Sequence, residues 1–241
     1  STRFPNKPMA KLLGKPMIGH VYDRVKLNKQ LTLVAVATCD EEIANYVRSI
    51  GGTAVMTGTH HQRASDRCAE ALLILERERE ETFDIVVMVQ GDEPLVHPEM
   101  IDKALDSIKS DQSVNVVNLI GTLKEEEFKD QNIIKVVTNK NLDALYFSRK
   151  PIPFMKNINL SLVGKQICII PFRRDFLLKY SELNPTPLEV TESIDMLRVL
   201  EHGYNVRMSP IQFDSHPVDV KEDINCVESL LDKDELFLKG Y

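Results

Sequence analysis

The sequence predicts an α/β fold with a mainly parallel sheet, helices on both faces of that sheet and an inserted antiparallel part. Up to about residue 112, short apolar runs rich in β-branched residues alternate with longer amphipathic runs, as in repeated β-α-β units. Beyond that point, strand-like runs follow one another without long helices between them. No linker or internal repeat divides the chain, so we predict one domain over residues 1–241.

The first part contains three predicted buried strands, at residues 31–38, 53–57 and 83–90. Its predicted helices follow Asp40 as far as Gly51, and then cover residues 64–77 and 98–109. The second part contains five strand-like runs, at residues 114–123, 132–139, 142–149, 166–172 and 204–211. The second and third of these are spaced for a hairpin. Two further helices are predicted, at residues 186–203 and 220–234; Thr186, Pro187 and Glu189 match a capping box and Gly203 a helix end.

The bulk properties restrict the class of protein. A net charge of −6 argues against a nucleic-acid partner, which usually requires a basic surface. No run of 18 apolar residues and no signal peptide is visible, so we expect neither a membrane span nor secretion. The four cysteines, Cys39, Cys68, Cys168 and Cys226, form no CxxC motif. We therefore expect reduced, mostly buried thiols in a cytoplasmic protein.

The N-terminal segment "STRFPNK" carries Arg3 and Lys7 without any helical or strand periodicity. Two cations on a loop beside strand ends suit a triphosphate, although a solvated basic terminus has the same composition. A second anion site is suggested at residues 60–72, where Ser65 or Asp66 can cap a helix whose free N–H groups attract anions. His60 and His61 precede this helix, but no further His or Cys stands at zinc-ligand spacing.

Carboxylates follow two predicted strands. Asp92 and Glu93 end the run "VMVQGDEPLV", and Asp219 lies in "HPVDVKEDI". Ligands of open parallel sheets bind beyond the carboxyl ends of the strands, so Asp92 and Asp219 together predict a Mg²⁺ site. On spacing alone, Asp219 also fits an N-cap of the last helix. We do not expect Glu93 to be a metal ligand, and assign it to support of the turn.

Taken together, these stretches are similar to those of a known family. "STRFPNKPMAKLLGKPMIGHVYDR", "VQGDEPLV", "NIIKVV", "ALYFSRKPIPF", "LRVLEHG" and "VDVKED" occur in the order found in sugar-acid cytidylyltransferases, in particular the 3-deoxy-manno-octulosonate (KDO) cytidylyltransferases. The resemblance spans nearly the whole chain. It implies the nucleotide-diphospho-sugar transferase fold, which is Rossmann-like, and transfer of CMP from CTP to a sugar acid with Mg²⁺ as cofactor.

The resemblance also implies roles for individual residues. Arg3 and Lys7 match phosphate-binding positions, and Asp92 and Asp219 match the metal-binding pair, so Lys7, Asp92 and Asp219 are the expected catalytic residues. The remaining expected substrate-binding residues are Ser65, Gln90, Arg149, Gln166 and Met196. The family further implies a homodimer, formed through the region "ALYFSRKPIPF".

The chain departs from the family pattern in several places. The family opens with an apolar strand ending in Pro-Ala-Arg, and we expect that central strand to be missing before Ser1. Arg63-Ala64-Ser65 replaces Ser-Gly-Thr, and Asn6 replaces Gly. On the sugar side, Gln166, Ile170 and Met196 replace His, Tyr and Gln, and Arg63 is a candidate for a replacement contact. The loss of polar partners weakens the specificity for KDO, so a related 2-keto sugar acid fits as well.

Two rival functions stay open. A nucleotidyltransferase acting on a sugar or alditol phosphate would require an extra basic pocket, for which the candidates are Arg149, Lys150 and Lys165. A non-catalytic nucleotide-binding homologue would be compatible with the missing strand.

Overall fold

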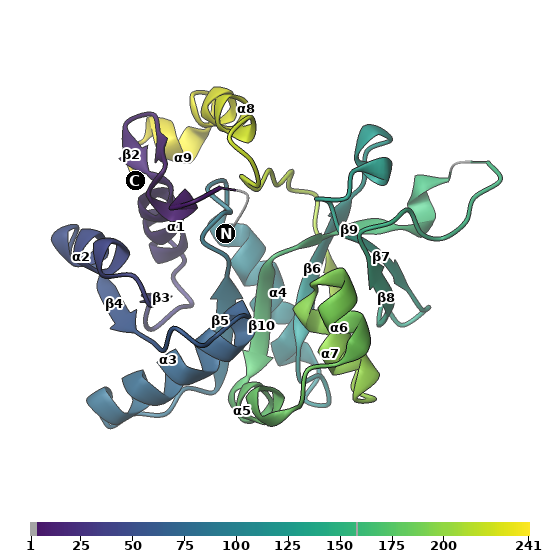
Figure 1. Ribbon diagram of the computed structural model, residues 1–241, viewed down its shortest axis with the longest axis horizontal. Helices are drawn as coiled ribbons and strands as arrows, with labels where there is room; N and C mark the ends of the chain where they lie inside the picture. The colour runs from purple at the N-terminus through teal and green to yellow at the C-terminus, as the bar shows by residue number, and fades with distance from the viewer. Residues whose placement is uncertain (1–3, 158) are drawn as a thin grey trace.

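The computed structural model describes residues 4–157 and 159–241, and Figure 1 shows its arrangement. The prediction for Arg3 concerns a residue outside the described ranges. The strands are β1 (Lys11–Leu12), β2 (Lys15–Pro16), β3 (Ala35–Thr38), β4 (Thr53–Met56), β5 (Ile85–Val89), β6 (Val117–Thr122), β7 (Lys135–Thr138), β8 (Ala144–Ser148), β9 (Gly164–Ile167), β10 (Ile169–Arg173) and β11 (Arg207–Pro210). The α-helices are α1 (Met17–Lys26), α2 (Glu41–Ser49), α3 (Ala64–Arg79), α4 (Pro98–Ser110), α5 (Arg174–Glu182), α6 (Pro187–Glu192), α7 (Asp195–Glu201), α8 (Asp223–Leu231) and α9 (Glu235–Leu238). Short 3₁₀ turns cover η1 (Lys7–Met9), η2 (Glu126–Lys129) and η3 (Leu160–Leu162).

The predicted α/β class with an antiparallel part is confirmed. β3 is parallel to β4 and β6 is parallel to β11, whereas β7 and β8 form the predicted antiparallel hairpin. A sheet in the order β11-β6-β9-β7-β8 carries the antiparallel part, which lies on the right in Figure 1.

β5 is covered on both faces because its alternate side chains enter different cores; Met88 is buried and the other four residues are partly buried. Met88 packs in a cluster with residues of α3, α5 and α7, including Leu72, Leu177 and Leu197. Val87 instead packs against residues of α1 and α4. This two-sided cover explains why the run is continuously apolar, and it fixes the carboxyl end of β5 in the middle of the molecule.

Two predicted elements are interrupted. The run at residues 166–172 is not one strand, because the chain passes at Cys168 from β9, which pairs with β6 and β7, to β10, which pairs with β5. The helix predicted at residues 186–203 is broken into α6 and α7 at Ser193, which has a φ of +56°. Arg149 donates from its side chain to the carbonyls of Glu192 and Ser193, and these contacts satisfy groups that a continuous helix would use.

Three smaller expectations are also wrong. α3 begins at Ala64 after Arg63, so neither Ser65 nor Asp66 is its N-cap. α8 begins at Asp223 after Glu222, so Asp219 is not an N-cap either. The cysteines are not mostly buried, since Cys39 and Cys226 are exposed and the other two are partly exposed. None of the helices in the described ranges is long and apolar enough to cross a bilayer.

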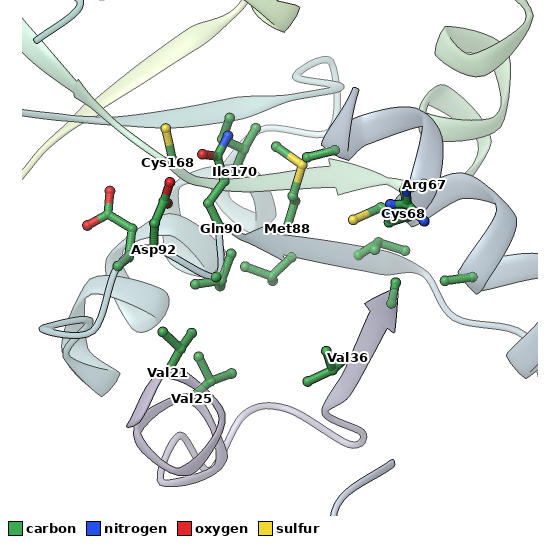
Figure 2. A pocket seen from close by; sticks show the side chains of 18 of the residues that line it. Val21, Val25, Val36, Arg67, Cys68, Met88, Gln90, Asp92, Cys168 and Ile170 are labelled. Atoms are coloured by element: carbon green, nitrogen blue, oxygen red, sulfur yellow. The ribbon is translucent and has the colours of Figure 1, made fainter. Parts of the chain in front are cut away.

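A groove separates β3 from β5. Among the described strands, β3 pairs only with β4 and β5 pairs only with β10. The free edges of β3 and β5 line one cavity of about 1210 Å³. Figure 2 shows Val36 on β3 and Val21 and Val25 on α1 across this space from β5, whose Met88 side chain points away from them into the other core. The groove is therefore an apolar slot between two strand edges, and it opens toward Asp92.

Candidate active site

The predicted carboxylate pair meets at a lysine. Lys7 Nζ lies 2.7 Å from Asp92 Oδ2 and 3.8 Å from Asp219 Oδ1. All three side chains are largely buried, with 12%, 20% and 22% of their side-chain surface exposed. The structure thus brings together three residues that are spread over more than 200 positions of the sequence, as the strand-end argument predicts. The Lys7 ammonium group is thus a cation that lies near both the Asp92 and the Asp219 carboxylate.

Backbone contacts fix the distance between the two acids. Asp92 follows β5, and its carbonyl accepts a hydrogen bond of 3.0 Å from the N–H of Val218. The next residue, Asp219, donates its own N–H to Asp223 Oδ2 at 2.7 Å, and Val220 donates to the same oxygen at 2.9 Å. The first turn of α8 therefore holds the Asp219 segment against the end of β5.

Lys7 is presented by a turn whose conformation explains one departure from the family pattern. Asn6 has a φ of +53°, in the left-handed region where Gly is usual and Asn is tolerated. Its side chain donates to Glu42 Oε2 at 3.1 Å, which ties the turn to α2. Asn6 can therefore stand where Gly is usual without moving Lys7.

Glu93 is buried, with 4% of its surface exposed, and it lines the same cavity as Asp92 and Asp219. It accepts a hydrogen bond from Ser215 Oγ, and this contact joins the turn after β5 to the segment that carries Asp219. Burial, followed by the nearby Asp92 charge, raises the pKa of Glu93 to about 7. The side chain supports the turn, in line with the role assigned from the sequence.

The sugar-side residues are distributed unequally. Gln90, Arg149 and Gln166 line the same cavity as Asp92, and Gln90 lies beside Cys168 and Ile170 in Figure 2. Gln166 Nε2 donates to Asn118 Oδ1 at 2.6 Å. Arg149 is anchored to the α6–α7 junction and reaches the Gln131 carbonyl at 3.1 Å. The Gln166 and Arg149 side chains are thus held by protein contacts at the cavity wall.

Met196 and Ser65 are placed differently from what the sequence suggests. Met196 has no exposed surface and packs in the core with Ile194 and Leu197, so its side chain does not reach the cavity in this conformation. Ser65 is also fully buried, and its hydroxyl donates to Asp195 Oδ2 at 2.7 Å. The apolar Met196 replaces a polar family residue because this position belongs to the core between α7 and the sheet.

A buried charge network lies beside these residues, and its pairings are not apparent from the sequence. Arg63 Nε lies 3.2 Å from Glu189 Oε1 and 3.7 Å from Asp195 Oδ1, and its guanidinium donates to Ser193 Oγ at 2.8 Å. Arg198 binds Glu189 through two contacts of 2.7 and 2.8 Å. Asp195 gives no sequence signal beyond its place in a predicted helix. Arg63 is thus occupied by carboxylates and stabilises the α6–α7 junction.

The donor set at Asp92 and Asp219 fits Mg²⁺. Two carboxylates from separate segments, open on one side to a cavity, leave further positions for phosphate oxygens and water, as this ion prefers. The Lys7 ammonium between them shows that a positive charge is accommodated there. No nitrogen or sulfur ligand is required.

Comparison with known proteins gives a consistent result at the level of sequence. A family model described as "Cytidylyltransferase" matches residues 1–211. The chain is 39% identical over 245 residues to 3-deoxy-manno-octulosonate cytidylyltransferase of Geobacter metallireducens, covering 97% of this chain and 94% of the relative. The enzyme of the same name from Zea mays is 40% identical over 234 residues, covering 96% and 77%.

Solved structures extend the comparison. A CMP:2-keto-3-deoxy-manno-octonic acid synthetase complexed with CTP matches with a TM-score of 0.85 and 34% identity, covering 97% of this chain and 94% of the other. The 4-diphosphocytidyl-2C-methyl-D-erythritol synthase from Anaerococcus prevotii matches with a TM-score of 0.60 at 10% identity, covering 93% of each chain. This second likeness concerns the fold alone.

Proposed function

Because this chain belongs to the 3-deoxy-manno-octulosonate cytidylyltransferase family, we propose that it transfers CMP from CTP to a 2-keto sugar acid, KDO or a related acid, and releases pyrophosphate. The observation that carries the proposal is the meeting of Lys7, Asp92 and Asp219 at the carboxyl end of β5. A triphosphate placed there would find a cation, two metal-binding carboxylates and an open cavity.

The reaction forms a bond between a sugar hydroxyl oxygen and the α-phosphorus, and breaks the bond from that phosphorus to the oxygen that bridges to the β-phosphate. The bonding electron pair leaves with pyrophosphate and the hydroxyl proton passes to solvent. Mg²⁺ held by Asp92 and Asp219 would neutralise charge on the phosphate oxygens. Lys7, released from its carboxylates by that ion, would stabilise the departing pyrophosphate. Gln90 and Gln166 at the cavity wall would contact the nucleotide and sugar.

The choice of sugar acid follows from the changed positions. Gln166 and Ile170 replace polar family residues of different shape, and Met196 is buried, so fewer groups can pair with the sugar hydroxyls. A site that lacks such partners discriminates weakly between related hydroxylated substrates. We therefore expect activity on several 2-keto sugar acids rather than a strong preference for KDO.

The direct test measures CTP-dependent pyrophosphate release by the chain with a panel of 2-keto sugar acids. We expect release that depends on the acid, with kcat/KM for KDO within about tenfold of the best alternative. A sugar phosphate panel serves as the control. Tight CTP binding without pyrophosphate release on any acid would instead indicate a non-catalytic homologue. A clear preference for KDO would reject only the proposed relaxed specificity and would leave the proposed CMP transfer in place.

The sugar phosphate alternative has less support. Lys165, one of its candidate cations, lies 2.6 Å from Glu127 Oε1 and 3.3 Å from Asp214 Oδ1, and only 3% of the residue is exposed. A lysine neutralised by two carboxylates contributes little to binding an additional phosphate. Arg149 is likewise anchored to backbone carbonyls.

We also propose that the enzyme is a homodimer and that it is located in the cytoplasm. A homodimer through residues 144–154 is supported by Leu145 and Phe154, whose exposed fractions of 60% and 95% are high for such large apolar side chains. A cytoplasmic location is consistent with a reaction that consumes CTP.

We propose, in addition, that an apolar β-strand joined to the N-terminal end of the chain fills the groove between β3 and β5. Lys7 lies at the carboxyl end of β5, so a strand entering this segment from the groove would run parallel to β5. It would pair two strand edges that are otherwise free in the described part of the chain. Its side chains would cover the apolar walls of the cavity.

Extension of the chain by about six apolar residues ending in Pro-Ala-Arg tests this proposal. Cys68 and Cys168 line the groove, so we expect their alkylation to become at least about tenfold slower, with Cys226 as an exposed internal reference. Burial, and then the Asp195 charge, raises the pKa of Cys68 to about 12, so its alkylation rate should rise with pH throughout the alkaline range. An extension of equal length interrupted by two prolines should give no protection. Equal protection by both extensions would contradict strand insertion.

A further inference from the structure

Three side chains with metal-binding atoms meet where the loop before α3 folds back on that helix. His60 and His61 come from the loop and Glu70 from α3. One ligand atom from each lies within 4.8 Å of the others. The pair of histidines has no third His or Cys at ligand spacing in the sequence, but the fold supplies a carboxylate instead.

The surrounding contacts hold these side chains in place. Glu70 Oε2 accepts a hydrogen bond of 2.9 Å from the N–H of Gly58, and it also contacts His61 Nε2. The two imidazole rings lie 4.1 Å apart, measured between centroids.

Gly58 also leaves the space that His60 occupies. A Cβ atom at residue 58 would collide with the His60 ring, so the ring packs directly against the backbone of the turn. An ion pair between His61 and Glu70 explains why these two side chains are close. It does not explain why His60 also lies near the same carboxylate.

We propose that His60, His61 and Glu70 bind one divalent metal ion of the zinc class. Two imidazole nitrogens and one carboxylate oxygen suit Zn²⁺, and three protein ligands leave a fourth position open for water. The ion would replace the direct contact between His61 and Glu70. This site differs in chemistry from the all-oxygen pair Asp92 and Asp219, which suits Mg²⁺.

The position of the site suggests what the metal does. His61 lines the same cavity as Arg63 and Asp92. An ion bound to His60, His61 and Glu70 would clamp the loop to α3 immediately before Arg63, which contacts the α6–α7 junction. The metal therefore serves as a clamp on one wall of the cavity, and this role does not depend on the identity of the sugar acid.

Isothermal titration of Zn²⁺ into the full chain, carrying Asp92→Asn to remove the competing carboxylate pair, tests the site. We expect one equivalent to bind, and Co²⁺ to give a visible spectrum typical of nitrogen and oxygen ligands. His60→Ala and Glu70→Gln should each weaken Zn²⁺ binding by at least about tenfold. Glu70→Gln keeps an acceptor for the Gly58 N–H, so it limits the damage to the turn.

His202→Ala provides the matched control, because His202 is an exposed histidine at the end of α7 whose ring contacts the Asn184 carbonyl. In the Asp92→Asn background, His202→Ala should bind Zn²⁺ as tightly as the Asp92→Asn chain does. Zn²⁺ should raise the thermal midpoint of the parent and of His202→Ala but not of Glu70→Gln. Absence of stoichiometric binding, or equal loss in His60→Ala and His202→Ala, would overturn the proposal. Binding is measured without CTP, so failure of the cytidylyl-transfer proposal would leave this test intact.

Discussion

Asp92→Asn and Asp219→Asn are each expected to lower kcat/KM for CMP transfer by about 10³-fold, equivalent to about 4 kcal/mol of transition-state stabilisation. Each change removes one charged ligand from a site that must neutralise a triphosphate. Asparagine preserves the size of the side chain, so the hydrogen bond from the Val218 N–H to the Asp92 carbonyl should survive. Steady-state pyrophosphate release over a range of Mg²⁺ concentrations provides the measurement.

The Mg²⁺ dependence separates a metal ligand from a residue that only shapes the turn. A lost ligand should raise the Mg²⁺ concentration needed for half-maximal activity, and the double variant should be little worse than either single variant because the two acids act as a unit. Asp175→Asn is the matched control, since this acid is exposed on α5 and pairs only with Arg174 in the described structure. Activity within about twofold of the parent in Asp92→Asn, at limiting Mg²⁺, would remove Asp92 from the catalytic site.

The acid pair could be predicted from the sequence because its position depends on a general property of the fold. A long apolar run covered on both faces must end at the sheet edge, and Asp92 directly follows such a run. The prediction that Glu93 supports the turn agrees with its hydrogen bond from Ser215, which joins that turn to the segment carrying Asp219. The meeting of Asp92 and Asp219 with Lys7 needed only the assumption that distant strand-end segments share one edge.

Other features depend on contacts that a linear pattern does not contain. Residues 166–172 read as one apolar strand, and nothing in that run indicates that Cys168 divides it between two sheets. α1 was not predicted, and its interior contains Gly19, which destabilises an isolated helix. In the fold, a Cβ at Gly19 would collide with the Tyr46 hydroxyl, so a larger residue there would force the Tyr46 side chain to move. Tertiary packing thus decided both outcomes.

The cluster of His60, His61 and Glu70 shows the same limit at a candidate site. A search for zinc ligands by His and Cys spacing finds two residues and stops. The third ligand is a glutamate nine residues after His61, and only the return of the loop onto α3 brings it near. Carboxylates are so common in sequences that their spacing alone has little predictive value.

Arg198 has the largest expected effect on stability. Its side chain is 3% exposed and makes bonds of 2.7 and 2.8 Å to Glu189, which has no exposed surface, and one of 2.9 Å to Asp66. Arg198→Ala would leave the Glu189 charge inside the protein with Arg63 as its remaining cation. Removing one partner of a buried ion pair costs about 3–5 kcal/mol, and the presence of Arg63 favours the lower limit.

We therefore expect Arg198→Ala to lower the free energy of unfolding by about 3 kcal/mol and the thermal midpoint by about 6–12 °C. Lys239→Ala is the control, because Lys239 is 72% exposed and its pair with Glu235 should contribute less than about 1 kcal/mol. Calorimetry of both variants against the parent gives the comparison. If the two variants unfold at the same temperature, the network does not stabilise the α6–α7 junction. If only Arg198→Ala is destabilised, the network of Arg63, Arg198 and Glu189 stabilises the α6–α7 junction. The cavity wall that carries Arg63 and Ser193 then depends on buried charges that meet where α6 and α7 are separated.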